Sequence, residues 1–200
     1  MSGPLGVILA GGLATRMGGG DKALLDLGGV TLLDQVIARL APQVTGLAIN
    51  ANGDAARFDR FGLPVVADSI EGYAGPLAGV LAGMDWAAGQ DAEAIVTVAG
   101  DTPFFPTDLV ETLVTVSKGQ EYPMVLAVTP DGRHPTFGLW PVALRGDLRD
   151  ALEGGLRKVV QWTDRHGCRD AMFTGAGDPF FNVNTPEDLE KARAIQGGRP

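Results

Sequence analysis

The stretch VILAGGLATRMGGGDKALL, from Val7 to Leu25, joins an apolar run directly to a segment with five glycines and only two basic side chains. A short apolar run of this kind is typical of a buried strand. Glycines after a strand let the backbone approach a ligand closely, and their amides can form an anion-binding nest. Arg16 and Lys22 can add charge-assisted hydrogen bonds to the same anion. The glycines around them favour this interpretation over two ordinary solvated charges.

Two common phosphate motifs do not describe this loop. The P-loop requires a Ser or Thr after a Gly-Lys pair, whereas Lys22 is preceded by Asp21 and followed by Ala23. The letters GGGDKA, from Gly18 to Ala23, fit the dinucleotide-binding pattern, but they lie well past the end of the strand rather than in the strand-to-helix turn. The remaining hypothesis is an anion nest that begins at Ala10.

Apolar runs and helical stripes alternate along the first half of the chain. The runs have the length and composition of strands buried on both faces: Leu5–Ala10, Gly46–Asn50, Pro64–Asp68 and Ala94–Gly100. Apolar stripes with helical period lie at Leu32–Leu40 and Leu109–Val114. This alternation predicts one doubly wound α/β domain, with a mostly parallel sheet and helices on both faces.

The second half of the chain has a different pattern. Met124–Val142 reads as two strands joined through Pro-Asp-Gly, which predicts a mixed or antiparallel addition to the sheet. Thr185 and Pro186 are typical of a helix N-cap and first helical position, so they predict the start of a final helix. From Gly146 to Asp178 the sequence does not define where elements begin and end.

Length and composition predict a single domain over residues 1–196, with 197–200 as a frayed tail. The formal net charge of −8 and the pI near 4.7 argue against nucleic-acid or membrane partners, which favour a broad cationic surface. The lone Cys168 cannot form an internal disulfide, and no leader or membrane-spanning run is apparent. We therefore expect a cytoplasmic protein.

A carboxylate stands at the end of a second apolar run, in VAGDTPF. Ligands of open α/β sheets bind at the carboxyl ends of the strands, so Asp101 is expected at the same edge as the glycine loop. A carboxylate beside phosphates suits Mg²⁺. An N-cap for the following turn, with Thr102 as the rival capping residue, is an equally open interpretation. Asp68 closes another strand, and GYAGPLAG forms a further glycine-bearing loop before a helix.

Seven stretches in this order resemble the MobA-type molybdenum cofactor guanylyltransferases: LAGGLATRMGGGDKALLDLGG, INAN, VVADS, GPLAGVLAG, AGDTPF, HPTFGL and FNVNTPEDL. The wider nucleotidyltransferase signature is matched at Leu9, Ala10, Gly11, Gly12, Arg16, Met17, Gly18 and Lys22. The resemblance covers nearly the whole chain. It implies a Rossmann-like nucleotidyltransferase fold.

The resemblance also implies roles for individual residues. The nucleotide would be bound by Leu9, Ala10, Gly11, Gly12, Arg16, Lys22, Asn50, Asp68 and Asp101, with Arg16, Lys22 and Asp101 catalytic and Asp101 the Mg²⁺ ligand. The acceptor would lie near Gly75, Pro76, Leu77, Gly79, His134, Asn182 and Asn184. The second polar position near the metal, in FNVNTPEDL, offers Asn182 and Asn184 instead of an aspartate. Because a neutral amide holds Mg²⁺ weakly, the metal is expected to arrive largely with the nucleotide. A structural role for His134 is equally open, and His166 is expected to be a surface residue without a part in the reaction.

The implied reaction is attack of the terminal phosphate of molybdopterin, or of Mo-molybdopterin, on the α-phosphorus of GTP, with release of pyrophosphate. Delivery proteins for molybdopterin and chaperones of molybdoenzymes are the implied protein partners. Two alternatives stay open on sequence alone: a sister transferase that uses CTP or a small phosphate acceptor, and a non-catalytic nucleotide sensor. The sensor is less favoured, because it needs no metal-assisted stabilisation of a leaving group.

Overall fold

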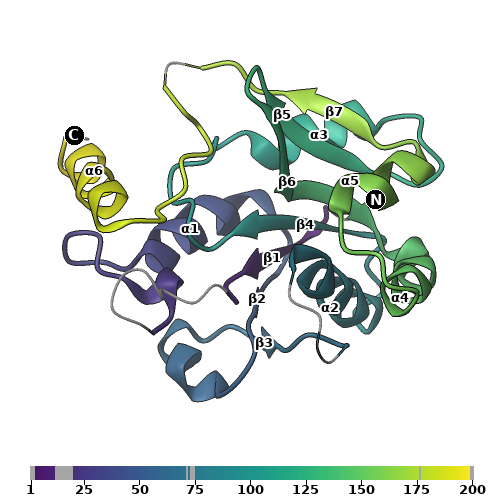
Figure 1. Cartoon of the computed structure of the whole chain (residues 1–200), viewed down its shortest axis with the longest axis horizontal. Helices are drawn as coiled ribbons and strands as arrows, with labels where there is room; N and C mark the ends of the chain where they lie inside the picture. The colour runs from purple at the N-terminus through teal and green to yellow at the C-terminus, as the bar shows by residue number, and fades with distance from the viewer. Residues whose placement is uncertain (1–2, 12–19, 71, 73–74, 176, 199–200) are drawn as a thin grey trace.

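The computed structural model describes residues 3–11, 20–70, 72, 75–175 and 177–198. A seven-stranded sheet runs through the molecule in the order β3-β2-β1-β4-β6-β5-β7 (Figure 1). Its strands are β1 (Leu5–Leu9), β2 (Leu47–Asn50), β3 (Val65–Val66), β4 (Ala94–Ala99), β5 (Val125–Thr129), β6 (Gly132–Pro141) and β7 (Arg169–Met172). The described part of the chain includes no helix that combines the length and apolar character needed to cross a bilayer.

The first four strands pair in parallel, as the alternation of strand and helix predicted. β6 pairs antiparallel with both β4 and β5, and β7 pairs parallel with β5. The expected doubly wound sheet with a mixed addition in the second half is therefore confirmed. The turn at Pro-Asp-Gly connects β5 and β6 where the sequence predicted it.

Helices cover both faces of the sheet (Figure 1). The α-helices are α1 (Leu32–Leu40), α2 (Pro76–Ala88), α3 (Leu109–Ser117), α4 (Arg145–Glu153), α5 (Val159–Thr163) and α6 (Pro186–Gly197). Short 3₁₀ segments are η2 (Lys22–Leu24), η3 (Ala41–Gln43), η4 (Ala55–Phe61), η5 (Val142–Leu144) and η6 (Asp164–His166). All of α5 and β7, and all but the first residue of α4, lie between Gly146 and Asp178, where the element boundaries were not predicted.

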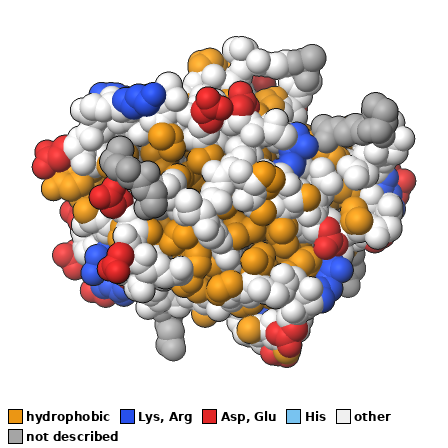
Figure 2. Space-filling model, turned by 180° about the vertical axis from the view of Figure 1, so that it is seen from behind, with side chains coloured by type: hydrophobic (Ala, Val, Ile, Leu, Met, Phe, Trp, Pro, Cys, Tyr) orange, Lys and Arg blue, Asp and Glu red, His pale blue; other side chains and the backbone are white. Residues whose placement is uncertain are grey.

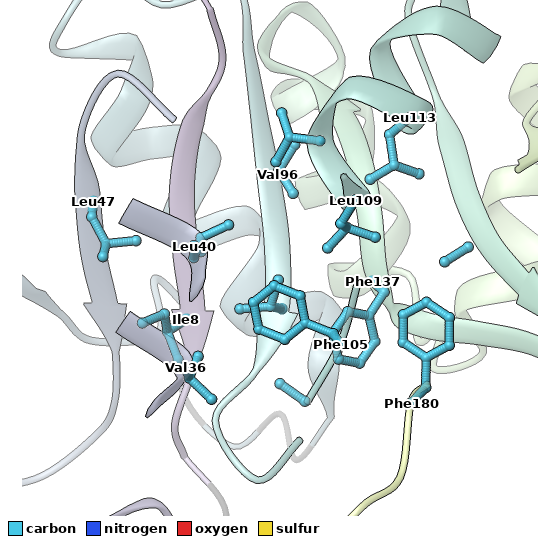
Figure 3. Packing of buried hydrophobic residues seen from close by; sticks show 14 of the residues in the cluster. Ile8, Val36, Leu40, Leu47, Val96, Phe105, Leu109, Leu113, Phe137 and Phe180 are labelled. Atoms are coloured by element: carbon cyan, nitrogen blue, oxygen red, sulfur yellow. The ribbon is translucent and has the colours of Figure 1, made fainter. Parts of the chain in front are cut away.

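Alternate side chains of the strands feed two apolar cores on opposite faces of the sheet. Ile8 of β1 packs with α1 and α3, whereas its neighbour Val7 packs with α2, α4 and α5. Figure 3 shows the first of these cores, where Phe105, Phe137 and Phe180 lie together beside the aliphatic side chains of α1 and α3. The two cores hold the strand ends in place from both sides.

Helix caps follow from local sequence. Thr31 and Thr185 each form a capping box, because each hydroxyl accepts from the amide of an Asp three residues later and that Asp accepts from the threonine amide. Pro76 and Pro186 occupy the first positions of α2 and α6, where a missing amide costs nothing. The predicted start of the final helix is thus confirmed.

Candidate active site

A pocket of about 340 Å³ lies at the carboxyl ends of β1, β2 and β4. Its walls are Leu9, Ala10, Gly11, Lys22, Ala23, Asn50, Asn52, Asp68, Gly75, Pro76, Ala99, Gly100, Asp101, Thr136 and Asn182. Polar side chains therefore converge from loops that are far apart in the sequence. This is the edge of an open α/β sheet where ligands bind.

Lys22 and Asp101 form an ion pair at the centre of this edge. The Lys22 ammonium donates to Asp101 Oδ2 at 2.6 Å, and both side chains are largely buried. Lys22 also donates to Asn184 Oδ1. The bare Gly100 before Asp101 lets the ends of β4 and β1 pack closely, because a Cβ at that position would lie 3.3 Å from the carbonyl oxygen of Leu9. The structure thus brings together three polar residues predicted from three different stretches.

The segment from Asn182 to Asn184 is held against Asp101. The Val183 amide donates to the Asp101 carbonyl oxygen at 2.9 Å, and Val183 itself is buried. The Thr102 hydroxyl donates to Asp101 Oδ1 at 3.2 Å and to Asn182 Oδ1. Both carboxylate oxygens of Asp101 therefore accept from side chains. The N-cap of the next α-helix, α3, is Asp108 and not Asp101 or Thr102.

Capping of α6 fixes the end of this segment. Asp188 accepts from the amides of Asn184 and Thr185 at 3.1 and 3.0 Å. These backbone donors hold the pKa of the Asp188 carboxyl below its ordinary value. The cap therefore places the Asn184 side chain next to Lys22.

Asp68 is held by two asparagines on the other side of the pocket. Asn50 donates to Asp68 Oδ1 at 3.0 Å, and Asn52 donates to Oδ2 at 2.8 Å. The Asp68 amide donates back to Asn52 Oδ1 at 2.8 Å. Gly79 of α2 makes room for this network, because a Cβ there would collide with the Asn50 amide. These contacts fix the direction in which the Asp68 carboxylate points.

The structure places the predicted site residues in several different settings. Those that line the pocket are Leu9, Ala10, Gly11, Lys22, Asn50, Asp68, Gly75, Pro76, Asp101 and Asn182. Asn184 and Gly79 contact lining residues, whereas Leu77 is buried in the core between α2 and the sheet. Gly12 and Arg16 lie outside the described residues, so their predicted roles stay predictions.

His134 lies away from this pocket. Its Nε2 shares a 2.9 Å hydrogen bond with the Thr129 hydroxyl, and its ring stacks on Phe180 with the centroids 4.4 Å apart. Burial lowers the pKa of this imidazole. The structure therefore places His134 in a packed, hydrogen-bonded setting. His166 is also partnered, because its Nε2 lies 2.7 Å from Asp147 Oδ1.

Sequence reasoning missed five residues of the pocket wall: Ala23, Ala99 and Gly100, and two with polar side chains, Asn52 and Thr136. Asn52 carried a usable signal: it stands two residues after Asn50, just beyond the end of a strand that points at the ligand edge. Thr136 lies inside β6, and its approach to the pocket depends on antiparallel pairing between β6 and β4. The register of that pairing has no local signature.

The oxygen atoms around Lys22 are suitable ligands for a divalent cation. Asp101 Oδ2 and Asn184 Oδ1 both accept from the same ammonium group, so they already surround one positive charge. Among the described residues, no group of three or more His, Cys, Asp or Glu side chains could hold a metal by themselves. Mg²⁺ takes one or two carboxylates and completes its shell with phosphate oxygens and water. The donor set therefore fits Mg²⁺ that is brought in with a phosphate ligand.

A twisted α/β sheet with a cation, a carboxylate and several amides at its strand ends defines an enzyme of the nucleotide-binding class. The model of the MobA-like NTP transferase domain matches residues 6–168. The chain belongs to this family of nucleotidyltransferases.

Individual relatives agree with this assignment. The molybdenum cofactor guanylyltransferase of Mesorhizobium japonicum is 50% identical over 196 residues, which cover 95% of this chain and 94% of the relative. The crystal structure of molybdopterin-guanine dinucleotide biosynthesis protein A from Archaeoglobus fulgidus has a TM-score of 0.79 at 21% identity, over 98% of this chain and all of that one. Rv0371c from Mycobacterium tuberculosis, determined in complex with manganese, has a TM-score of 0.66 at 22% identity, with 96% and 99% of the two chains covered.

Proposed function

We propose that the protein is a cytoplasmic, Mg²⁺-dependent guanylyltransferase, which transfers GMP from GTP to the terminal phosphate of molybdopterin or Mo-molybdopterin and releases pyrophosphate. The observation that carries the proposal is the arrangement of Lys22, Asp101 and Asn184 around one cation at the ligand edge of the sheet. The half-identical curated guanylyltransferase, matched over nearly its full length, supports the choice of substrates. Protein partners that deliver molybdopterin stay a prediction from the family resemblance.

The two substrates require no general base. A phosphate monoester is already anionic at neutral pH, so its oxygen can attack the α-phosphorus without losing a proton in the transition state. A bond forms between this oxygen and the α-phosphorus, and the bond from the α-phosphorus to the bridging oxygen of pyrophosphate breaks. The protein's part is therefore alignment of the reactants and neutralisation of charge.

Lys22 and Asp101 must exchange partners when the nucleotide binds. In the free protein they neutralise each other at 2.6 Å. A triphosphate offers Lys22 a more highly charged partner, and the ammonium group then stabilises the charge that develops on the leaving pyrophosphate. The carboxylate of Asp101, together with the amide oxygen of Asn184, becomes available to Mg²⁺. When bound, Mg²⁺ supplies charge neutralisation on the phosphate oxygens.

The opposite wall of the pocket would hold the nucleoside. Asp68 presents a carboxylate whose direction is fixed by Asn50 and Asn52. A fixed acceptor discriminates between groups that donate hydrogen bonds and groups that do not, because an unmatched buried polar group is costly. The acceptor substrate would enter past Gly75, Pro76 and Asn182, which line the same cavity.

A single assay tests the proposal. Purified protein, Mg²⁺ and molybdopterin are incubated with GTP or with CTP, and pyrophosphate is measured. We expect release with GTP and little with CTP, and none with GTP after the metal is removed by a chelator. Release with CTP alone would contradict the choice of guanine. Tight binding of GTP without pyrophosphate release would favour a nucleotide sensor instead.

A further inference from the structure

Arg57 does not line the pocket, but it contacts two segments that do: the one that leads into Lys22 and the loop that carries Asn52. It belongs to the 3₁₀ segment η4, which is capped by the Asp54 side chain. Its guanidinium lies over the ring of the buried Phe58, 4.6 Å from the centroid. This stacking fixes the plane of the guanidinium, so its donors point in set directions.

One side of Arg57 faces the segment that carries Lys22. Arg57 Nε lies 2.5 Å from Asp21 Oδ2, and the two side chains are only 25% and 13% exposed. Asp21 stands at the N-cap position of η2, yet its side chain makes no capping hydrogen bond there. The carboxylate is instead engaged by Arg57. The ion pair therefore anchors the backbone immediately before Lys22.

The other side of Arg57 faces the loop that follows β2. Arg57 Nη2 donates to the carbonyl oxygen of Asn52 at 2.6 Å, and Nη1 donates to that of Asp54. Asn52 in turn holds Asp68 through two hydrogen bonds of 2.8 Å. The guanidinium thus fixes the backbone of the residue that orients the Asp68 carboxylate.

We propose that Arg57 is a positioning residue that holds the Lys22 segment and the Asn52–Asp68 network at a fixed separation, so that phosphates and nucleoside of one GTP molecule are bound together. The inference rests on the proposed function. A planar guanidinium suits this task, since it can pair with a carboxylate and donate to carbonyl oxygens at the same time. Loss of the connection misplaces both ends of the substrate relative to each other, and small misplacements are costly in binding and rate.

Arg60 offers a matched control within the same segment. Like Arg57, it pairs with an aspartate, Asp34, at 2.7 Å and lies over a phenylalanine ring, that of Phe61, at 4.2 Å. Its partners are in α1 and not in the pocket wall. A general effect of losing an arginine from η4 would therefore appear in both variants, whereas a positioning effect would appear in one.

The test compares Arg57→Ala and Arg60→Ala by calorimetric titration with Mg²⁺ and GTP, by pyrophosphate release and by thermal melting. We expect Arg57→Ala to weaken the Kd for GTP about 10-fold and to lower kcat as well, because the ion pair with Asp21 is lost on one side of the pocket and hydrogen bonds from a charged donor are lost on the other. Arg60→Ala should lower Tm about as much as Arg57→Ala does, yet it should change the Kd and kcat less than about twofold. Equal Kd and kcat values in the two variants would overturn the inference.

Two further variants carry the test by themselves if Arg57→Ala does not fold. Asp21→Asn removes the charge at one end only and should weaken the Kd for GTP, and an unchanged Kd would contradict the inference. Arg57→Lys keeps the charge but not the fork, so its Kd should be weaker than that of wild type. Where Arg57→Ala folds, adding Asp21→Asn to it should cause no further loss, because both act through one contact, and fully additive effects would contradict the inference.

The outcomes separate this inference from the proposed function. The Kd for GTP does not depend on turnover, so wild-type protein that binds GTP without releasing pyrophosphate would refute the transferase while the comparison of Arg57 with Arg60 still decides the inference. Wild-type protein that binds no GTP would overturn both.

Discussion

The two halves of the sheet use their polar side chains differently. In the parallel half, formed by β3, β2, β1 and β4, polar groups stand at the strand ends and face the pocket, as Asn50, Asp68 and Asp101 do. In the half formed by β6, β5 and β7, the polar groups mainly bind one another. Arg133 pairs with Asp164 and Asp170 at 2.8 Å each, and these carboxylates raise the pKa of its guanidinium.

The large aromatic residues of the second half also lie away from the pocket. In the second half, Trp162 is fully buried, stacks on Trp140 and donates to Asp147 at 2.7 Å. None of these three lines the pocket. The comparison suggests a division of work: the parallel half supplies most of the chemistry, and the mixed half stabilises the sheet. Among the residues that the structure describes, Thr136 and Asn182 are the ones that the second half contributes to the cavity wall.

The largest expected effect is that of Asp101→Ala, which removes the carboxylate that pairs with Lys22. We expect turnover to fall about 10²- to 10³-fold, the usual cost of losing one electrostatic contact in a transition state. The fold should persist, because the lost side chain faces a cavity. Pyrophosphate release and circular dichroism on the same sample check both statements. Near-wild-type turnover would remove Asp101 from the mechanism.

Next in size is Trp162→Phe in the mixed half. The smaller ring loses the hydrogen bond to Asp147 and part of its packing on Trp140, so the free energy of unfolding should fall by about 2 kcal/mol. Urea denaturation measures this change. At temperatures where the variant is folded, kcat/KM for GTP should match wild type; a large loss of kcat/KM would show that the two halves are not separate in function.

A smaller effect is expected for Gly79→Ala in α2, which adds one methyl group. The new Cβ would collide with the Asn50 amide and displace it from Asp68. KM for GTP should rise about 10-fold, because a hydrogen bond to a charged group is disturbed. Gly146→Ala is the matched control in α4, since a Cβ there meets nothing within 4 Å. Equal KM values in the two variants would contradict the predicted role of Asn50.

The smallest effect concerns acid stability. Despite some burial, hydrogen bonds from Trp162 and His166 hold the pKa of Asp147 below its ordinary value. A carboxyl whose pKa is lowered by folding stabilises the protein above its unfolded pKa, and this contribution is lost as pH falls through the folded pKa. Asp147→Asn should therefore flatten the loss of stability below about pH 4 without changing pyrophosphate release at neutral pH. An unchanged acid limb of the stability profile would contradict the shift.

Regular local patterns explain what the sequence predicted well. The apolar runs before Gly11, Asn50 and Asp101 indicated parallel strands, and their ends indicated the edge at which the pocket lies. Contacts between distant segments were harder to foresee. The family resemblance placed Lys22 and Asn184 at one site, but it did not predict the hydrogen bond between them. The contacts of Asn52 and Arg57 depend on the path of a loop and a 3₁₀ segment, which have no periodic signal.

Hydrophobic side chains gather on one face of the molecule. Figure 2 shows hydrophobic side chains gathered over the middle of the face opposite to the view in Figure 1, with charged side chains mostly towards its margins. Partly buried side chains such as Ile37, Val44 and Val114 pack against the core on the α1 and α3 side.

The contact between Lys22 and Asn184 spans 162 positions of the chain. A ribosome makes the lysine early and the asparagine only after every strand of the sheet has been translated. A nascent chain that stops short of Asn184 can pair its strands and bury its cores, yet its pocket lacks one wall around the central cation. The pocket is thus completed later in synthesis than the sheet that carries it.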